Sequence, residues 1–96
     1  MSLVMLVTLK AHAASFDQLK KTIQAILPDT VTFNGCLGVS ACADEQDHSV
    51  TLYERWATPE AQQSYLAWRG ETGDLDGLGT VLREPPSFEP KEGIFP

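Results

Sequence analysis

A carboxylate and an indole stand two residues apart at the end of a predicted strand, where the chain passes into a predicted helix. Glu54 and Trp56 share one face of this strand, because successive side chains of a strand point to opposite faces. Arg55 takes the other face. A carboxylate among apolar neighbours needs a partner or contact with water, and burial raises its pKa toward the range of a general base. We therefore expect a pocket at this junction.

Two helices and four strands are predicted to position the junction. A helix begins at Phe16, with Ser15 and Gln18 as a capping box, and is expected to stop at Pro28. The second helix opens with Thr58 as N-cap and a proline at the first helical position. The predicted elements are strands at 3–11, 34–43, 48–56 and 87–95, helices at 16–27 and 59–69, and a short helix at 75–82 that contains two glycines.

This order of elements, β-α-β-β-α-(α)-β, predicts an α+β fold. It is the ferredoxin-like split β-α-β arrangement, an antiparallel sheet with helices on one face. In the second strand, alternation places Leu37, Val39 and Ala41 on one face. Both faces of the sheet then carry apolar residues, with Met5 and Tyr53 also among the candidates. Because one short chain cannot cover both faces, we expect a homodimer in which two sheets pack face to face.

Size and charge limit the classes of partner. The 96 residues are expected to form one domain, residues 1–96. Thirteen acidic against seven basic residues give a net charge of −6, which argues against nucleic acid and anionic membranes as partners. No stretch is long enough to span a bilayer and 3–9 lacks the features of a signal peptide, so we expect a cytoplasmic protein. Cys36 and Cys42 have no ligand at metal-binding spacing beside them, so no metal is expected.

The run from Tyr53 to Ala61, YERWATPEA, together with the element order and the length, resembles the antibiotic biosynthesis monooxygenase (ABM) domain family. The resemblance covers about residues 3–95 and implies the dimeric α+β barrel fold. It also implies a quinol-monooxygenase-like reaction that uses molecular oxygen without metal or flavin, so no cofactor is expected. Typical members carry a histidine in the second helix, roughly where Tyr65 stands here. Since a helix histidine is the axial ligand in the haem-degrading branch, this departure argues against haem degradation.

The resemblance implies specific tasks for the residues near the junction. The site must hold a flat ring, take a proton from its hydroxyl and exclude water. Glu54, Tyr65 and Arg69 are the expected catalytic residues, with Glu54 as the base and Arg69 or Arg55 stabilising the oxyanion. The substrate, a small aromatic or hydrophobic molecule, is expected to contact Trp56, Trp68, Phe33 and, at the rim, His12.

Each of these residues also has a purely structural interpretation. Glu54 can be a structural acid paired with Arg55, Arg69 or a backbone N–H, and the tryptophans can be core residues. Two other functions therefore stay open on the same fold. One is a non-catalytic protein that binds a small hydrophobic metabolite, and the other is a proton-transfer isomerase with Glu54 as its base.

Overall fold

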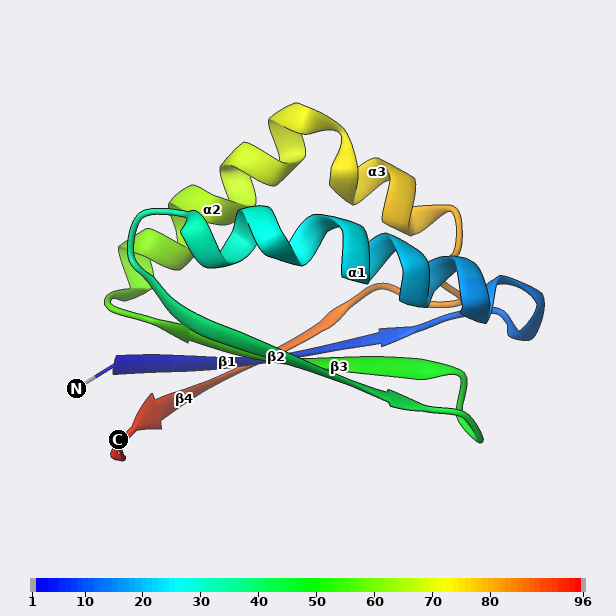
Figure 1. Cartoon of the computed structure of the whole chain (residues 1–96), viewed down its shortest axis with the longest axis horizontal. Helices are drawn as coiled ribbons and strands as arrows, with labels where there is room; N and C mark the ends of the chain where they lie inside the picture. The colour runs from blue at the N-terminus through cyan, green and yellow to red at the C-terminus, as the bar shows by residue number, and fades with distance from the viewer. Residues whose placement is uncertain (1, 96) are drawn as a thin grey trace.

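The computed structural model describes residues 2–95 as a four-stranded antiparallel sheet with the helices on one face (Figure 1). The strand order is β2-β3-β1-β4, so the two central strands are β3 and β1. This confirms the α+β, ferredoxin-like prediction. The elements are β1 (Ser2–Lys10), the 3-10 turn η1 (Ala13–Ser15), α1 (Phe16–Thr32), β2 (Cys36–Asp44), β3 (Ser49–Trp56), α2 (Pro59–Thr72), α3 (Asp74–Gly79) and β4 (Ser87–Gly93).

The central pair of strands places the predicted site residues over the core. Leu3 pairs with Trp56 and Met5 pairs with Glu54, so both members of the junction face the helices. Strand β4 extends the same face, because Phe88 pairs with Val7, the next residue of β1 that points toward the helices. The buried core therefore lies between these strands and the helices, and it comprises Met5, Val7, Leu9, Ala11, Phe16, Leu19, Ile23, Val50, Leu52, Trp56, Tyr65, Leu78 and Leu82.

A β-bulge in β2 changes the predicted alternation of that strand. The pairing register shifts between Cys36 and Gly38, so Cys36 is opposite Trp56 while Val39 is opposite Glu54. Leu37 is the extra residue, and its side chain is 55% exposed. The prediction that Leu37 and Val39 share a face is therefore wrong, because the inserted residue reverses the alternation after it.

Helix α1 continues five residues beyond its predicted end and passes through Pro28. Proline removes one helical hydrogen bond, to the carbonyl of Gln24, but both residues lie on the exposed side where water can take its place. The last turn is held from outside the helix, because the guanidinium of Arg69 donates to the carbonyl of Ile26. The predicted capping box is also absent, since the Ser15 side chain makes no capping hydrogen bond.

Helix α2 begins as predicted and ends three residues later than expected. The hydroxyl of Thr58 accepts a hydrogen bond from the Ala61 N–H at 3.1 Å, and Pro59 occupies the first turn. Gly73 ends the helix with φ +82°, a conformation that favours glycine. The following helix, α3, is shorter than the predicted 75–82, because Leu82 instead forms a β-bridge with Ala11.

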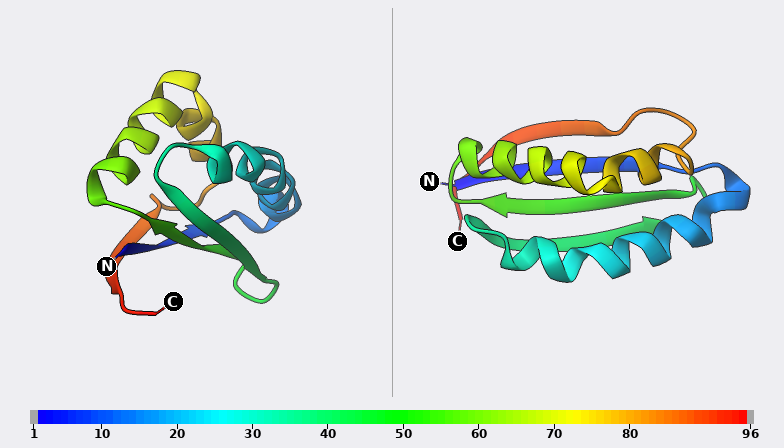
Figure 2. Two further views of the ribbon diagram at one scale, coloured as in Figure 1. Left: turned by 60° about the vertical axis from the view of Figure 1, so that its left-hand side comes forward. Right: turned by 90° about the horizontal axis from the view of Figure 1, so that it is seen from above.

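The other face of the sheet has no helix over it (Figure 2). Tyr53 on β3 points to this face and is 46% exposed. Val4 and Leu6 alternate with the buried residues of β1 and are half-buried there. Met5, a candidate for this face, instead belongs to the core under the helices. No helix within residues 2–95 is long and apolar enough to cross a membrane.

Candidate functional site

Glu54 is a buried carboxyl on the floor formed by the two central strands. Only 5% of its surface is exposed, and the indole Nε1–H of Trp56 donates to its Oε1 at 3.1 Å. Burial raises the pKa of Glu54 above its ordinary value, and the Trp56 hydrogen bond acts in the opposite direction. The alternation read from the sequence therefore placed both residues on the correct face.

A cavity of about 50 Å³ lies between this floor and the helices, and Glu54 is one of its walls. The other polar side chains that line it are Tyr65, Arg69 and Asp74. The remaining walls are mostly aliphatic and come from the central strands, all three helices and the start of β4: Val7, Leu9, Ile23, Ile26, Leu27, Leu52, Leu66, Leu75, Leu78, Pro86 and Phe88. A carboxyl in such surroundings has few competing partners, so a ligand hydroxyl would find Glu54 available.

Arg69 is the centre of a buried polar network that joins the helices. Its Nε donates to the Tyr65 hydroxyl at 2.8 Å, and its Nη1 donates to Asp74 Oδ2 at 2.8 Å. Its Nη2 donates both to the Ile26 carbonyl at 2.7 Å and to Thr30 Oγ1 at 3.0 Å. Since the Arg69 side chain is only 4% exposed, these bonds satisfy a charge that would otherwise be buried alone.

The Tyr65 hydroxyl belongs to the same network. It lies 2.6 Å from Thr30 Oγ1 and accepts from Arg69, so the three side chains are mutually hydrogen bonded. Both Tyr65 and Arg69 thus line the cavity, as a catalytic role would require, while their polar atoms are held by protein partners. The structure gives each of them a clear part in packing helix α1 against α2.

The three aromatic residues expected to contact the substrate, Phe33, Trp56 and Trp68, pack against one another and against Tyr65, which makes a cluster of four rings. Phe33 has its ring centroid 5.5 Å from that of Trp68 and 5.3 Å from that of Tyr65, while Trp56 and Tyr65 are 5.1 Å apart. Of the four, only Tyr65 lines the cavity. Phe33, Trp56 and Trp68 therefore stand behind the wall of the cavity, and Trp56 reaches the site through its hydrogen bond to Glu54.

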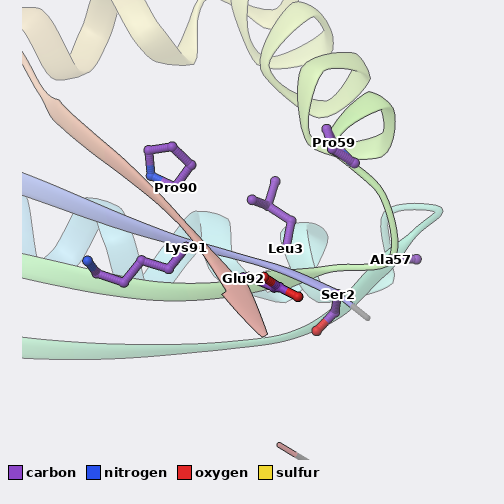
Figure 3. A pocket seen from close by; sticks show the side chains of 7 residues that line it. All are labelled: Ser2, Leu3, Ala57, Pro59, Pro90, Lys91 and Glu92. Atoms are coloured by element: carbon purple, nitrogen blue, oxygen red, sulfur yellow. The ribbon is translucent and has the colours of Figure 1, made fainter. Parts of the chain in front are cut away.

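Two other predicted participants lie away from the cavity. His12 is exposed after the end of β1, at the opposite end of that strand from the Leu3–Trp56 pair, and it is not among the lining residues. Arg55 is half-buried on the face of the sheet that has no helices over it, as its alternation with Glu54 predicted. A wider hollow of about 370 Å³ lies near Pro59 and Pro90 at the sheet end (Figure 3), but it is open and Glu54 does not line it.

Thr30, Asp74 and Phe88 belong to the site or its network but were not predicted as site residues. Thr30 is fully buried in the part of α1 that was expected to lie beyond a proline stop. Arg69 lies on the buried face of α2 together with Gln62 and Tyr65. A spacing of seven residues between Gln62 and Arg69 is a helical signal for that face, although both are polar.

The fold and the site together define a class: a split β-α-β domain with a buried acid in a small apolar cavity between sheet and helices. The model of the family described as antibiotic biosynthesis monooxygenase matches residues 2–72. Because this match spans more than half of the sequence, the chain belongs to the ABM family. Within residues 2–95, no group of three or more His, Cys, Asp and Glu side chains could hold a metal ion.

Solved structures with the same fold share little sequence with the chain. A Nitrosomonas europaea protein of unknown function is 19% identical with a TM-score of 0.86, over 99% of this chain and 91% of that one. A Deinococcus radiodurans protein assigned provisionally as an antibiotic biosynthesis monooxygenase is 24% identical with a TM-score of 0.83, over 95% and 91% of the two chains. At these identities the likeness shows the fold alone. None of the curated proteins matches the chain.

Proposed function

We propose that the chain is a cofactor-independent monooxygenase that oxidises a small phenol or quinol with molecular oxygen. The observation that carries the proposal is the buried carboxyl of Glu54, which faces an apolar cavity and has a raised pKa. A raised pKa suits a general base that works near neutral pH. Membership of the ABM family supports the same assignment.

In this reaction Glu54 accepts the proton of the ring hydroxyl and leaves an electron-rich anion in a site closed to water. The anion passes one electron to oxygen and the two radicals combine at a ring carbon. Loss of water then leaves one oxygen atom in the product, so that a naphthoquinol and O₂ give a hydroxynaphthoquinone and H₂O. The Trp56 N–H keeps one carboxylate oxygen occupied and so orients the other toward the cavity.

Tyr65 and Arg69 have a different part in this proposal from the one the resemblance implied. Their polar atoms are bound to Thr30, Asp74 and a backbone carbonyl, so we assign them to holding the cavity wall. No free cation then faces the anion, so the apolar, dry site makes the anion more reactive toward oxygen and protects it from side reactions rather than stabilising it.

Oxygen uptake with menadiol, a naphthoquinol, tests the proposal directly. The wild-type protein should consume oxygen faster than a protein-free control and should place one ¹⁸O atom from ¹⁸O₂ in the product. Glu54→Gln is the matched variant, because the amide oxygen can still accept from Trp56 while the base is lost. Equal rates of oxygen uptake by the wild type and Glu54→Gln would show that Glu54 is not the base. Turnover of a substrate without oxygen would instead indicate a proton-transfer isomerase.

We also propose that the uncovered sheet face packs against a second copy of the chain. The face carries exposed Tyr53 and Leu37, and half-buried Val4 and Leu6 lie on β1, one of its two central strands. Covering such a face removes apolar surface from water, which favours association. Light scattering coupled to gel filtration should give twice the monomer mass at micromolar concentration, and a stable monomer would contradict the proposal.

A further inference from the structure

The cavity above Glu54 is too small for the ring that the proposed function requires. An engineered protein cavity of about 150 Å³ holds benzene, whereas this cavity measures about 50 Å³. A wall must therefore move before any aromatic molecule can reach Glu54. The floor is held in place, because the ladder between β1 and β3 pairs eight successive residues from Leu3 to Lys10.

Helix α3 has the features of a wall that can move. It is six residues long, it contains Gly77 and Gly79, and no side chain caps its first turn. It is joined to α2 by Gly73, which has a φ of +82°, and a Cβ added there would meet no atom within 4 Å, so the joint has room for rotation. Three of its side chains, Asp74, Leu75 and Leu78, line the cavity directly.

Two contacts tie α3 to the rest of the molecule: the buried side chain of Leu78 and one ion pair at the first residue of the helix. Asp74 Oδ2 accepts from Arg69 Nη1 and from the Thr72 hydroxyl, both at 2.8 Å. These two partners hold the pKa of Asp74 below its ordinary value. If Asp74 moved away, Arg69 would stay in place, because Tyr65 and α1 hold it through other nitrogen atoms. The pair is therefore placed to act as a latch, because breaking it would leave the other hydrogen bonds of Arg69 intact.

We propose that α3 is a movable wall of the Glu54 cavity, hinged at Gly73 and held closed by the Asp74–Arg69 pair. Leu75, which lies at the cavity and is 40% exposed, then determines the size of the molecule admitted. The identity of that molecule as a neutral hydroxylated ring rests on the proposed function. The need to admit a ring rests on it as well, whereas the hinge at Gly73 and the Asp74–Arg69 latch are argued from the geometry of α3 alone.

Hydrogen exchange along the chain tests the motion without any ligand or reaction. In Asp74→Asn, the amides of residues 77–79, the first that can hydrogen bond within α3, should exchange about fivefold faster than in the wild type, the size expected for a partly exposed ion pair. In Gly77→Ala the same amides should exchange about fivefold slower, because alanine favours the helix and its Cβ would meet no atom within 4 Å. Exchange in β1 and β3 should not change in either variant.

Asp76→Asn is the matched control for the latch. It removes a second acid from the first turn of the same helix, but Asp76 makes no ion pair with the residues that the structure describes. In Asp76→Asn the α3 amides should exchange at rates close to those of the wild type. Equal α3 exchange in Asp74→Asn and Asp76→Asn would overturn the latch, and α3 amides as slow as those of β1 would overturn the movable wall.

Binding of 2-naphthol, followed by tryptophan fluorescence in a stopped-flow instrument, tests admission to the cavity. The association rate should rise in Asp74→Asn and fall in Gly77→Ala, in step with exchange. Leu75→Ala should shift preference toward three-ring 9-phenanthrol by about tenfold, the scale of discrimination by apolar pockets. An unchanged preference would overturn the role of Leu75. Failure of 2-naphthol to bind any variant, with the exchange differences present, would count against the proposed substrate class and not against the motion.

Discussion

Replacing Trp56 with phenylalanine should strengthen proton binding by Glu54. The substitution keeps an aromatic ring in the cluster with Phe33 and Tyr65 but removes the N–H that donates to Oε1 at 3.1 Å. That hydrogen bond favours the charged carboxylate and lowers the pKa of Glu54 against the effect of burial. Without it, the pKa of Glu54 should rise further above its ordinary value.

The energetic consequence depends on pH. A hydrogen bond to a charged group contributes about 1.5–3 kcal/mol, against about 0.5–1.5 kcal/mol for one between neutral groups. Trp56→Phe should therefore cost about 1 kcal/mol more stability where Glu54 is ionised than where it is protonated. The loss of ring volume is the same at every pH, so the difference between two pH values isolates the hydrogen bond.

The direction follows from proton linkage. Because the folded-state pKa of Glu54 lies above the ordinary 4.5, the favourable contribution of its proton is fully present below that value and is lost as pH rises through the folded pKa. In Trp56→Phe the stabilisation by the Glu54 proton should begin to fall at the same low pH. It should go on falling to a higher pH than in the wild type, because the folded-state pKa of Glu54 is higher in the variant. The variant should thus differ from the wild type most at the alkaline end of the range.

Two measurements check this reasoning. Carboxyl ¹³C NMR should show the Glu54 titration displaced to higher pH in Trp56→Phe, and urea unfolding at several pH values should show the added loss of stability. Trp68→Phe is the matched control, because Trp68 lies in the same cluster but makes no hydrogen bond to Glu54. An unchanged Glu54 titration in Trp56→Phe would refute the role given to the indole N–H.

Three further predictions, two of them with a matched control variant, concern other parts of the structure. Arg69→Ala should lower the free energy of unfolding by about 3 kcal/mol, because Tyr65 and Asp74 lose their hydrogen-bond partner. Urea unfolding measures this change. A loss smaller than that of a surface ion pair would contradict the structural role of the network. Gly35→Ala should cost about 1–3 kcal/mol of stability, because φ at Gly35 is +92° and an added Cβ would lie 2.5 Å from Ala61 Cβ. Gly70→Ala is the control, because an added Cβ there would lie 3.9 Å from Leu75 Cδ1. In thermal melts this control should be neutral or stabilising. Thr58→Ala should remove the α2 cap and cost about 1 kcal/mol, with Thr58→Ser retaining most of the stability.

The sequence allowed the floor of the site to be predicted, because strand alternation is a local property. The burial of Glu54 and Trp56 and the exposure of Tyr53 follow from period-two spacing alone. The bulge at Leu37 was not predictable, because an inserted residue in one strand is visible only against the strand that pairs with it.

The walls of the site were harder to predict than its floor. Thr30 and Tyr65 lie 35 residues apart, and no local pattern indicates that their hydroxyls meet. The proline within α1 gave a valid local signal, but tertiary contacts from Arg69 to Ile26 hold the helix beyond it. Large aromatic residues near a predicted site can fill space as well as line it, and here Phe33 and Trp68 fill it.

The network around Arg69 restricts how this sequence can change during evolution. Thr30, Tyr65 and Arg69 each satisfy the other two, so replacing one alone leaves a buried donor or acceptor without a partner. A histidine at position 65 would be shorter than the tyrosine, and its ring could not make the same pair of contacts. Relatives with histidine there should therefore also differ at positions 30 and 69, so the three positions should covary as one unit. An alignment in which position 65 varies independently of the other two would show that the lineage tolerates the broken network.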